Sequence, residues 1–456
     1  MLRRLAVFIP ALAAVALLLS PARGSGAPAH TRAPVRTPAP ASLSALDVIA
    51  LEIAYTTVMA RYYQPVDPAL LLHGGRDAVV GYLRGRGVAN PAIPVAPART
   101  DRIRAENEIA RDVALAIARY GTRVRTGDLV RSVIAGELAA LNDPYTVLFE
   151  PAAYKKFVGF LDGTPVGGIG AELDVDPATH AVRVVDVFPG SPAEGAGIVP
   201  GDVITSIDGN APPVDNPAAV AAALRGVPTS TVRVGVTREG VVREPVAIVR
   251  RAIAPPDVTG RIIAGEIAYI RLRSFGATSA KQLDQLLPRL RDAGARAYVL
   301  DLRANGGGYR DDAIAVASHF VRGTVVTTQE RGGAPSVFSA TRGVTPLDLP
   351  LAVLVDGDSA SASEIVAGAV QDAKTGTLVG TRTFGKGLVQ ETFPLPDGGA
   401  IKMTTARYRT PSGRDIDKIG ITPDVVVPQP SDAHPGQPGR DPQLDRALAL
   451  LASKPA

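Results

Sequence analysis

Three closely spaced serines and one isolated lysine could carry out nucleophilic catalysis. Ser359, Ser361 and Ser363 alternate with small residues in the stretch Asp-Ser-Ala-Ser-Ala-Ser. A serine hydroxyl becomes a good nucleophile only when a base takes its proton, and a lysine amine can be that base if burial lowers its pKa. Lys386 lies between two glycines and is one of only eight lysines. The residues alone leave two interpretations open, a buried base or a lysine in a surface loop.

The composition excludes several other chemistries. The chain has no cysteine, which rules out disulfides, a cysteine nucleophile and thiolate metal sites. Its five histidines form no close pair, so we expect no histidine-ligated zinc site: His30, His73, His180, His319 and His434. Catalysis by a serine and a lysine needs no metal or organic cofactor, and none is expected. The net charge of +5, from 49 basic and 44 acidic residues, comes without a dense basic stripe. We therefore expect no binding to nucleic acid.

The first residues have the pattern of an export signal. Arg3 and Arg4 precede an apolar run over 5–19, and small residues follow up to Ala27. A run of about 15 residues is short of the ~20 that span a bilayer. Residues 1–27 are thus predicted to be a signal peptide of an exported protein, periplasmic or otherwise extracytoplasmic. If the signal stays uncleaved, it anchors the protein to the membrane.

The pattern beyond the signal predicts a multidomain α+β protein. A Pro/Ala-rich linker over 28–42 leads into a helical N-terminal region, 43–162, with helices at 43–63, 69–83, 101–120 and 127–141. A β-rich module, 163–253, follows, with strands at 182–187, 203–207, 232–236 and 246–249 and a helix at 217–224. Strands and helices then alternate over 254–428, which predicts an α/β core. Its strands are expected at 267–272, 297–302, 325–328, 351–355 and 378–380, and its helices at 280–293, 311–320 and 361–373. A C-terminal tail, 429–456, holds one short helix at 445–451.

The β-rich module resembles a PDZ domain. The matching stretches are 167–173 (Gly-Gly-Ile-Gly-Ala-Glu-Leu), 190–193, 196–198, 201–204 and 207–209. The resemblance implies a groove that binds a peptide at Gly168, Ile169, Gly170 and Ala171, with the helix at 217–224 as its other wall. Glycines without Cβ atoms allow backbone N–H groups to converge on a terminal carboxylate. The alternative is a β-barrel module with ordinary glycine turns.

The α/β region resembles the S41 family of C-terminal processing peptidases, also called tail-specific proteases. Four stretches carry the likeness, 267–275, 301–308, 357–368 and 380–390, and Asn-Asp-Pro-Tyr-Thr at 142–146 fits the N-terminal part of that family. The resemblance covers about 45–428. It implies a ClpP/crotonase-like serine protease core with Ser361 as nucleophile, Lys386 as base and Gln390 orienting the lysine amine.

The same resemblance assigns supporting roles. Gly307 and Ala362 would donate backbone N–H groups to the oxyanion, and Ala362 is suited to this because unpaired N–H groups point outward at a helix N-terminus. Gly306 stands where the family often has proline, so this turn is expected to be looser. Asp372 matches an acid of some members. Eleven residues separate it from Ser361, ~16 Å along an ideal helix, so it is expected to support the lysine or the fold.

Together these residues predict a serine endopeptidase that holds the C-terminal tails of exported proteins and cleaves them. Its partners would be proteins or peptides with accessible C-termini. The alternative is a binding protein, a catalytically inactive PDZ adaptor on a peptidase fold. Such a protein would be expected to have lost at least one of Ser361, Lys386 and Gln390. An α/β hydrolase of small esters predicts a G-x-S-x-G stretch, which differs from the serine-rich stretch here. The helical region leaves oligomerisation open.

Overall fold

The computed structural model describes residues 43–456 apart from 96–99, 177–178, 215–216, 345, 431–432 and 453–456. The predicted signal peptide, 1–27, and linker, 28–42, therefore lie outside the described residues. In the part that is described, every helix is too short or too polar to cross a bilayer.

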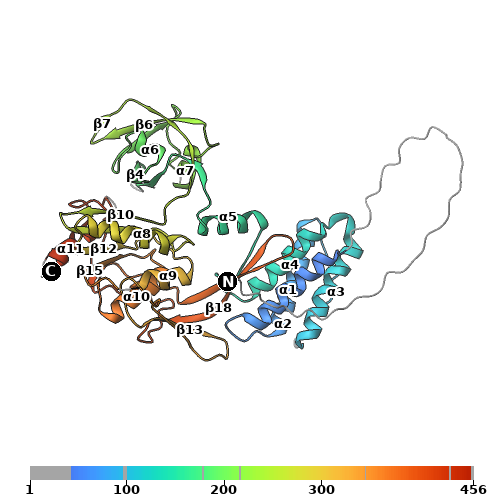
Figure 1. Ribbon diagram of the computed structural model, residues 1–456. Coiled ribbons are helices and arrows are strands. Elements are labelled where there is room, and N and C mark those ends of the chain that lie inside the picture. The colour runs from blue at the N-terminus through green and yellow to red at the C-terminus, as the bar shows by residue number, and fades with distance from the viewer. Residues whose placement is uncertain are drawn as a thin grey trace, which may run out of the picture. The chain divides into compact units, whose positions relative to one another are not determined.

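Four described α-helices of the N-terminal region lie side by side in Figure 1 and confirm the four predicted ones: α1 (Ala45–Arg61), α2 (Pro68–Gly85), α3 (Arg102–Tyr120) and α4 (Thr126–Ala140). Helix α1 begins with a capping box, because Ser44 and Asp47 each accept a hydrogen bond from the other's backbone N–H. Asp67 caps α2, which has proline at its first position. Apolar side chains from all four helices share one core, which also takes in Ile401 and Met403 of a distant strand.

A β-rich region follows the helix α5 (Pro151–Leu161). Its main sheet has the order β3-β4-β5-β6-β7, with β8 also paired to β6. The strands are β3 (Ala171–Val175), β4 (Val182–Val187), β5 (Val203–Ile207), β6 (Thr231–Arg238), β7 (Val241–Val242) and β8 (Val246–Val249). Helices α6 (Pro192–Gly195) and α7 (Pro217–Leu224) pack on them, and β2 (Val166–Gly168) pairs with β9 (Arg251–Ile253). The predicted strands and the predicted helix of this region are confirmed.

The α/β region is built on a six-stranded sheet with the order β10-β11-β12-β15-β16-β19. These strands are β10 (Val258–Ile263), β11 (Ile267–Leu272), β12 (Ala297–Asp301), β15 (Leu351–Val355), β16 (Thr377–Gly380) and β19 (Val425–Val426). All pairs are parallel except β10 with β11. Every residue of β11, β12 and β15 is buried, as expected for a sheet covered on both faces.

Helices cover both faces of this sheet. The helices α8 (Ser279–Asp292), α9 (Arg310–Ala317) and α10 (Ala362–Ala373) pack on one face, where Ile270, Leu300 and Val353 point. The helix α11 (Pro442–Ala452) packs on the other face, against Tyr269 and Val299. The segment predicted as a C-terminal tail thus contributes a helix to the core.

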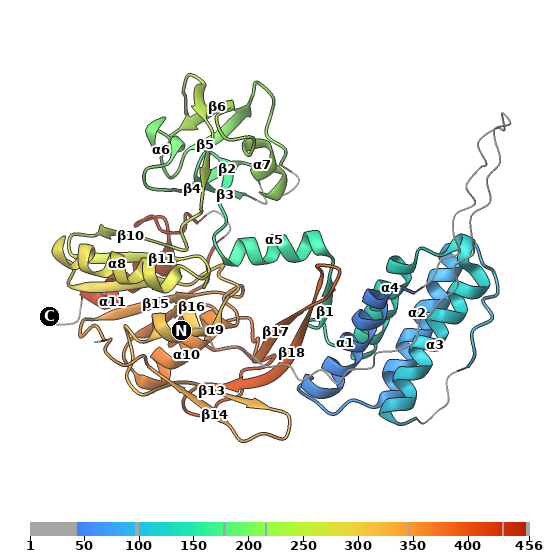
Figure 2. The same cartoon turned by 45° about the vertical axis from the view of Figure 1, so that its right-hand side comes forward.

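A second sheet was not predicted from the sequence. It contains β1 (Val147–Phe149), β13 (Thr324–Glu330), β14 (Ser336–Ser339), β17 (Leu388–Pro394) and β18 (Ala400–Arg409). Strands β17 and β18 form a hairpin (Figure 2), and β18 also pairs with β1 and β13. Side chains alternate between the two faces of a strand, so β18 buries Ile401 and Met403 in the helical core and turns Lys402 to its other face.

Candidate active site

The three candidate serines have different environments. The Ser359 hydroxyl is buried and donates to the Leu302 carbonyl at 2.9 Å, and the Ser363 hydroxyl is buried and donates to the Asn305 carbonyl at 2.8 Å. Both hydroxyls hold the turn in place. Ser361 is the serine of this set that lines a cavity. Its backbone has φ 56° and ψ −113°, a conformation that costs a non-glycine residue about 1–3 kcal/mol and is concentrated at functional sites.

A single buried carboxylate, that of Glu364, connects the serine turn to the lysine loop. Glu364 is fully buried in the first turn of α10 and accepts the Ser361 N–H at 2.9 Å, which forms half of a capping box. From the loop before β17 it accepts the Thr383 hydroxyl at 2.6 Å and the N–H groups of Gly385 and Lys386, both at 2.8 Å. The capping-box spacing from Ser361 to Glu364 was visible in the sequence, whereas the contacts of Glu364 to the loop were not.

The Lys386 side chain is partly buried beside an aromatic ring. Its Nζ is 5.1 Å from the ring centroid of Tyr145, which belongs to the Asn-Asp-Pro-Tyr-Thr stretch. Burial is the largest cause that lowers the pKa of Lys386, from 10.5 to about 8. The charge of Lys402 lowers this pKa further, whereas the carboxylates of Glu364 and Asp143 oppose the shift. The amine is therefore much closer to neutral at physiological pH than an exposed lysine.

Ser361 and Lys386 line the same cavity, of about 810 Å³. Helix α5 supplies aromatic and aliphatic side chains to its wall, and the glycine turn after β12 and the hairpin β17–β18 supply the rest. The candidate residues Gly307, Ala362 and Gln390 line it as well. Among the described residues, no hydrogen bond joins the Ser361 hydroxyl to the Lys386 amine. The amine lies over the Tyr145 ring instead.

The candidate oxyanion donors meet beside the serine. A Cβ atom added to Gly307, which has φ 102°, would lie 2.9 Å from Ser361 Cβ and 3.0 Å from the Ala362 nitrogen. Only glycine fits there. The Gly307 N–H donates to the Asn305 side-chain oxygen at 2.9 Å, so in this arrangement the donor is already in use. Ala362 is the first residue of α10, where N–H groups have no acceptor within the helix.

A buried charge cluster holds the end of β12, from which the glycine turn leads. Asp301 accepts hydrogen bonds from Arg303 and from the Tyr269 hydroxyl at 2.7 Å, and Arg271 forms an ion pair with it at 3.2 Å. Arg303 also pairs with Asp441 at 2.8 Å, just before α11. Burial alone would raise the pKa of Asp301, but the two arginines hold that pKa well below its usual range. Ion pairs between buried charges of opposite sign therefore hold the end of this strand.

The structure also gives the contacts of the two remaining candidates, Gln390 and Asp372. Gln390 and Lys386 do not share a strand face, because β17 begins only at Leu388 and a bulge follows at Gln390. The Gln390 amide donates to the Leu388 carbonyl at 3.2 Å. Asp372 accepts the Ser412 N–H at 2.8 Å and pairs with Arg414 at 2.5 Å. It supports the turn at 410–414, and the contacts of its carboxylate do not include the lysine.

One of the candidate peptide-binding residues, Ala171, lies on an edge strand of its sheet. Among the described strands, β3, which begins at Ala171, is the first of its sheet and pairs with β4 alone. An unpaired edge can accept an extended peptide as another strand. Gly170 has φ 81°, and a Cβ there would lie 2.4 Å from Ser191 Cβ, so the approach to β3 requires glycine. Ile169 is buried in the core of this region, and Gly168 belongs to β2.

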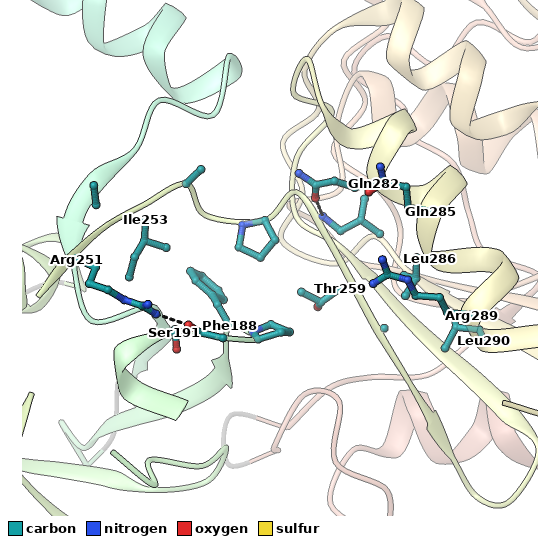
Figure 3. Close-up of a pocket in the computed structure, with 17 residues that line it drawn as sticks. Phe188, Ser191, Arg251, Ile253, Thr259, Gln282, Gln285, Leu286, Arg289 and Leu290 are labelled. Carbon is teal, nitrogen blue, oxygen red and sulfur yellow. Dashed lines mark hydrogen bonds between the residues drawn. The ribbon is translucent and has the colours of Figure 1, made fainter. Parts of the chain in front are cut away.

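A second cavity, of about 700 Å³, lies elsewhere (Figure 3). Its lining contains none of the candidate catalytic residues. On one side it is lined by Phe188, Arg251 and Ile253, and on the other by Gln282, Leu286 and Arg289 of α8. Among the described residues, no cluster of histidine, aspartate and glutamate side chains is arranged to hold a metal ion. Of these two cavities, the first brings a serine and a lysine of lowered pKa together.

Comparison with known proteins identifies the class of the chain. Residues 266–427 match peptidase family S41, and residues 183–238 match a PDZ domain. A carboxyl-terminal-processing protease of Synechocystis sp. (strain ATCC 27184 / PCC 6803 / Kazusa) is 38% identical over 339 residues, 72% of this chain and 78% of the relative. One of Picosynechococcus sp. (strain ATCC 27264 / PCC 7002 / PR-6) is 40% identical over 312 residues, 67% of this chain and 75% of the relative.

The chain therefore belongs to peptidase family S41 and carries a PDZ domain. It is a serine-type C-terminal processing peptidase. The crystal structure of a protein assigned to the S41 proteases in Bacteroides fragilis has the same fold, with a TM-score of 0.57 at 16% identity, covering 88% of this chain and 96% of that one. The multidomain α+β architecture and the family predicted from the sequence are both confirmed.

Replacing Glu364 by glutamine tests its connecting role. The substitution leaves an amide nitrogen facing N–H donors, which should destabilise the fold by about 1–3 kcal/mol and lower kcat/KM. It also removes a negative charge that raises the pKa of Lys386. The acid limb of the pH–activity profile should therefore move to lower pH, if that amine is the base. Thermal unfolding and kcat/KM against pH measure the two effects.

Asp372→Asn is the matched control, because it removes a carboxylate from the same helix that contacts only the turn at 410–414. It should lower stability and leave the acid limb where it is. A Glu364→Gln enzyme with unchanged stability and an unchanged acid limb would contradict the connecting role.

Proposed function

We propose that Ser361 is the nucleophile and Lys386 the general base of an endopeptidase that cleaves near the C-terminal tails of proteins. One observation carries this proposal. The two side chains line one cavity, Glu364 connects their backbones, and Lys386 has a pKa lowered to about 8. A lysine so placed is neutral often enough to accept the serine proton, whereas an arginine would stay charged.

The proposed reaction is acyl transfer. The neutral Lys386 amine accepts the Ser361 proton, the serine oxygen attacks the peptide carbonyl carbon, and the Ala362 and Gly307 N–H groups hold the oxyanion. The resulting ammonium gives its proton to the leaving amine as the carbon–nitrogen bond breaks. Water, deprotonated by the same amine, then hydrolyses the acyl-enzyme. The step requires Lys386 to turn from Tyr145 to Ser361 and Gly307 to release Asn305. In this proposal Gln390, which lines the same cavity, orients the amine.

We further propose that the PDZ domain, taken as 163–253, binds the tail of the substrate. The open edge of β3 at Ala171 and the close approach at Gly170 support this. The relatives from Synechocystis and Picosynechococcus are named as carboxyl-terminal-processing proteases, which agrees with substrates that offer a free tail. The helical region, 43–162, and the peptidase core, 254–428, complete the proposed domains.

Export is proposed from the N-terminal sequence, with 1–27 as a signal peptide. Two arginines followed by an apolar run of about 15 residues motivate this. Expression of the full chain in a bacterium, followed by fractionation and N-terminal sequencing, should find the protein outside the cytoplasm. Cleavage near Ala27 or an intact anchored form would each agree with export, and an intact cytoplasmic protein would overturn it.

Substitution of the proposed pair tests the mechanism. Ser361→Ala, Lys386→Ala and Lys386→Arg should each lower kcat/KM for a peptide substrate at least ~1000-fold with little change in thermal unfolding. Lys281→Ala, at an exposed position of α8, is the control for loss of a lysine and should keep full activity. The Ser361 assignment fails if Ser361→Ala keeps its activity while Ser359→Ala, which removes a buried hydroxyl, loses it.

The pH dependence of the rate tests the base. An amine with a pKa of about 8 is protonated below that pH and unable to accept the serine proton. We expect kcat/KM to fall about tenfold for each pH unit below the pKa and to level off above it. A profile that stays flat between pH 6 and pH 9, in an enzyme shown to stay folded, would exclude Lys386 as the base.

A further inference from the structure

A second lysine, Lys402, lines the cavity of Ser361 and Lys386 and has no part in the proposed acyl transfer. It lies on β18, opposite Val147 of β1 and Thr392 of β17. Its neighbours along the strand, Ile401 and Met403, are buried in the helical core, so the alternation of the strand directs Lys402 to the cavity. This is an unusual place for a lysine, because a flexible ammonium group is normally left in water.

The Lys402 side chain rests on an aromatic pair. Its Nζ lies 5.5 Å from the ring centroid of Phe149 and 5.8 Å from that of Phe157, and the two rings stack at 5.0 Å. The faces of aromatic rings attract a cation, but they leave its charge and its three N–H donors available. The contact therefore holds the ammonium group at one place on the cavity wall, and it leaves the N–H donors of that group free for a hydrogen-bond acceptor.

Lys402 also has no ion pair with any of the described residues. Asp143 is the acidic group that acts on it most, yet that carboxylate already accepts the Tyr145 N–H at 2.9 Å and the hydroxyls of Thr146 at 2.6 Å and Thr404 at 2.7 Å. Lys386 is positive or neutral, and Glu391 of β17 pairs with Arg61. The pKa of Lys402 is lowered mainly by burial, so the folded protein bears a cost for keeping this cation in the cavity.

We propose that Lys402 binds a carboxylate of the substrate inside the active-site cavity. The negative groups of a peptide are carboxylates, carried by aspartate and glutamate side chains or by the free C-terminus. Such a group would supply the ion-pair partner that the described residues leave out, and the aromatic pair would hold the ammonium ready for it. The inference rests on the proposed function, because it requires that this cavity takes the peptide.

Paired peptides distinguish the two sources of the carboxylate. A quenched fluorescent peptide of neutral residues is compared with versions that carry glutamate or glutamine at each position flanking the cleaved bond, and with versions whose C-terminus is free or amidated. The kcat/KM ratio within each pair is measured at one pH for the wild type, Lys402→Met and Lys402→Arg. Taking ratios within one enzyme removes any effect of Lys402 on Lys386. Lys155→Met, exposed on α5, is the control for loss of a nearby charge.

In at least one pair, the wild type and Lys155→Met should cleave the carboxylate version about tenfold faster or more, as expected for a charge-assisted hydrogen bond. Lys402→Met should lose that preference and Lys402→Arg should keep it. If every ratio is close to one in the wild type, or if Lys402→Met keeps the preference, the proposal is overturned. A preference for the free C-terminus that survives in Lys402→Met belongs to the PDZ groove. Absence of any cleavage that depends on Ser361 would overturn the proposed function as well.

Discussion

The buried carboxylate of Glu364 is the interaction on which the candidate site depends. It joins the first turn of α10 to the loop before β17, two segments that could otherwise move apart. Removing a carboxylate from water is costly unless hydrogen bonds compensate, and here four donors do so. Three of those donors are backbone N–H groups. The carboxylate therefore sets the position of the backbone at Ser361 relative to the backbone at Gly385 and Lys386. The side chains of Ser361 and Lys386 follow from that position.

Around the lysine, the effects that favour the neutral amine outweigh those that favour the ammonium ion. Burial and the neighbouring Lys402 favour the neutral amine, whereas Glu364 and Asp143 favour the ammonium ion. The outcome is a pKa of about 8, at which the amine exchanges a proton easily near neutral pH. Lys402 thus contributes to this balance and, in our proposal, also to substrate binding. Tyr145 gives the amine a resting place that is apolar yet favourable to positive charge.

The hairpin β17–β18 joins parts of the fold that the chain order separates. On one face of β18, Ile401 and Met403 belong to the core of the N-terminal helices. Farther along the strand, the Tyr408 hydroxyl donates to the Ser361 carbonyl at 3.1 Å. The start of β17 follows directly on the Lys386 loop. The helical region is therefore packed against the strand that forms a wall of the active-site cavity.

The sequence by itself determined five strands of the α/β region (β11, β12, β13, β15 and β16), its helices α8, α9 and α10, the PDZ domain, the family and the candidate pair Ser361 and Lys386. These follow from local periodicity and from motifs within short stretches, where neighbours in the chain decide the structure. Only the tertiary structure decided that Glu364 connects the pair, that Tyr145 lies beneath the amine and that Lys402 shares the cavity. It also showed that Gln390 is not on a strand face with Lys386. Such contacts join residues far apart in the chain, and their geometry depends on packing and burial that local sequence patterns do not specify.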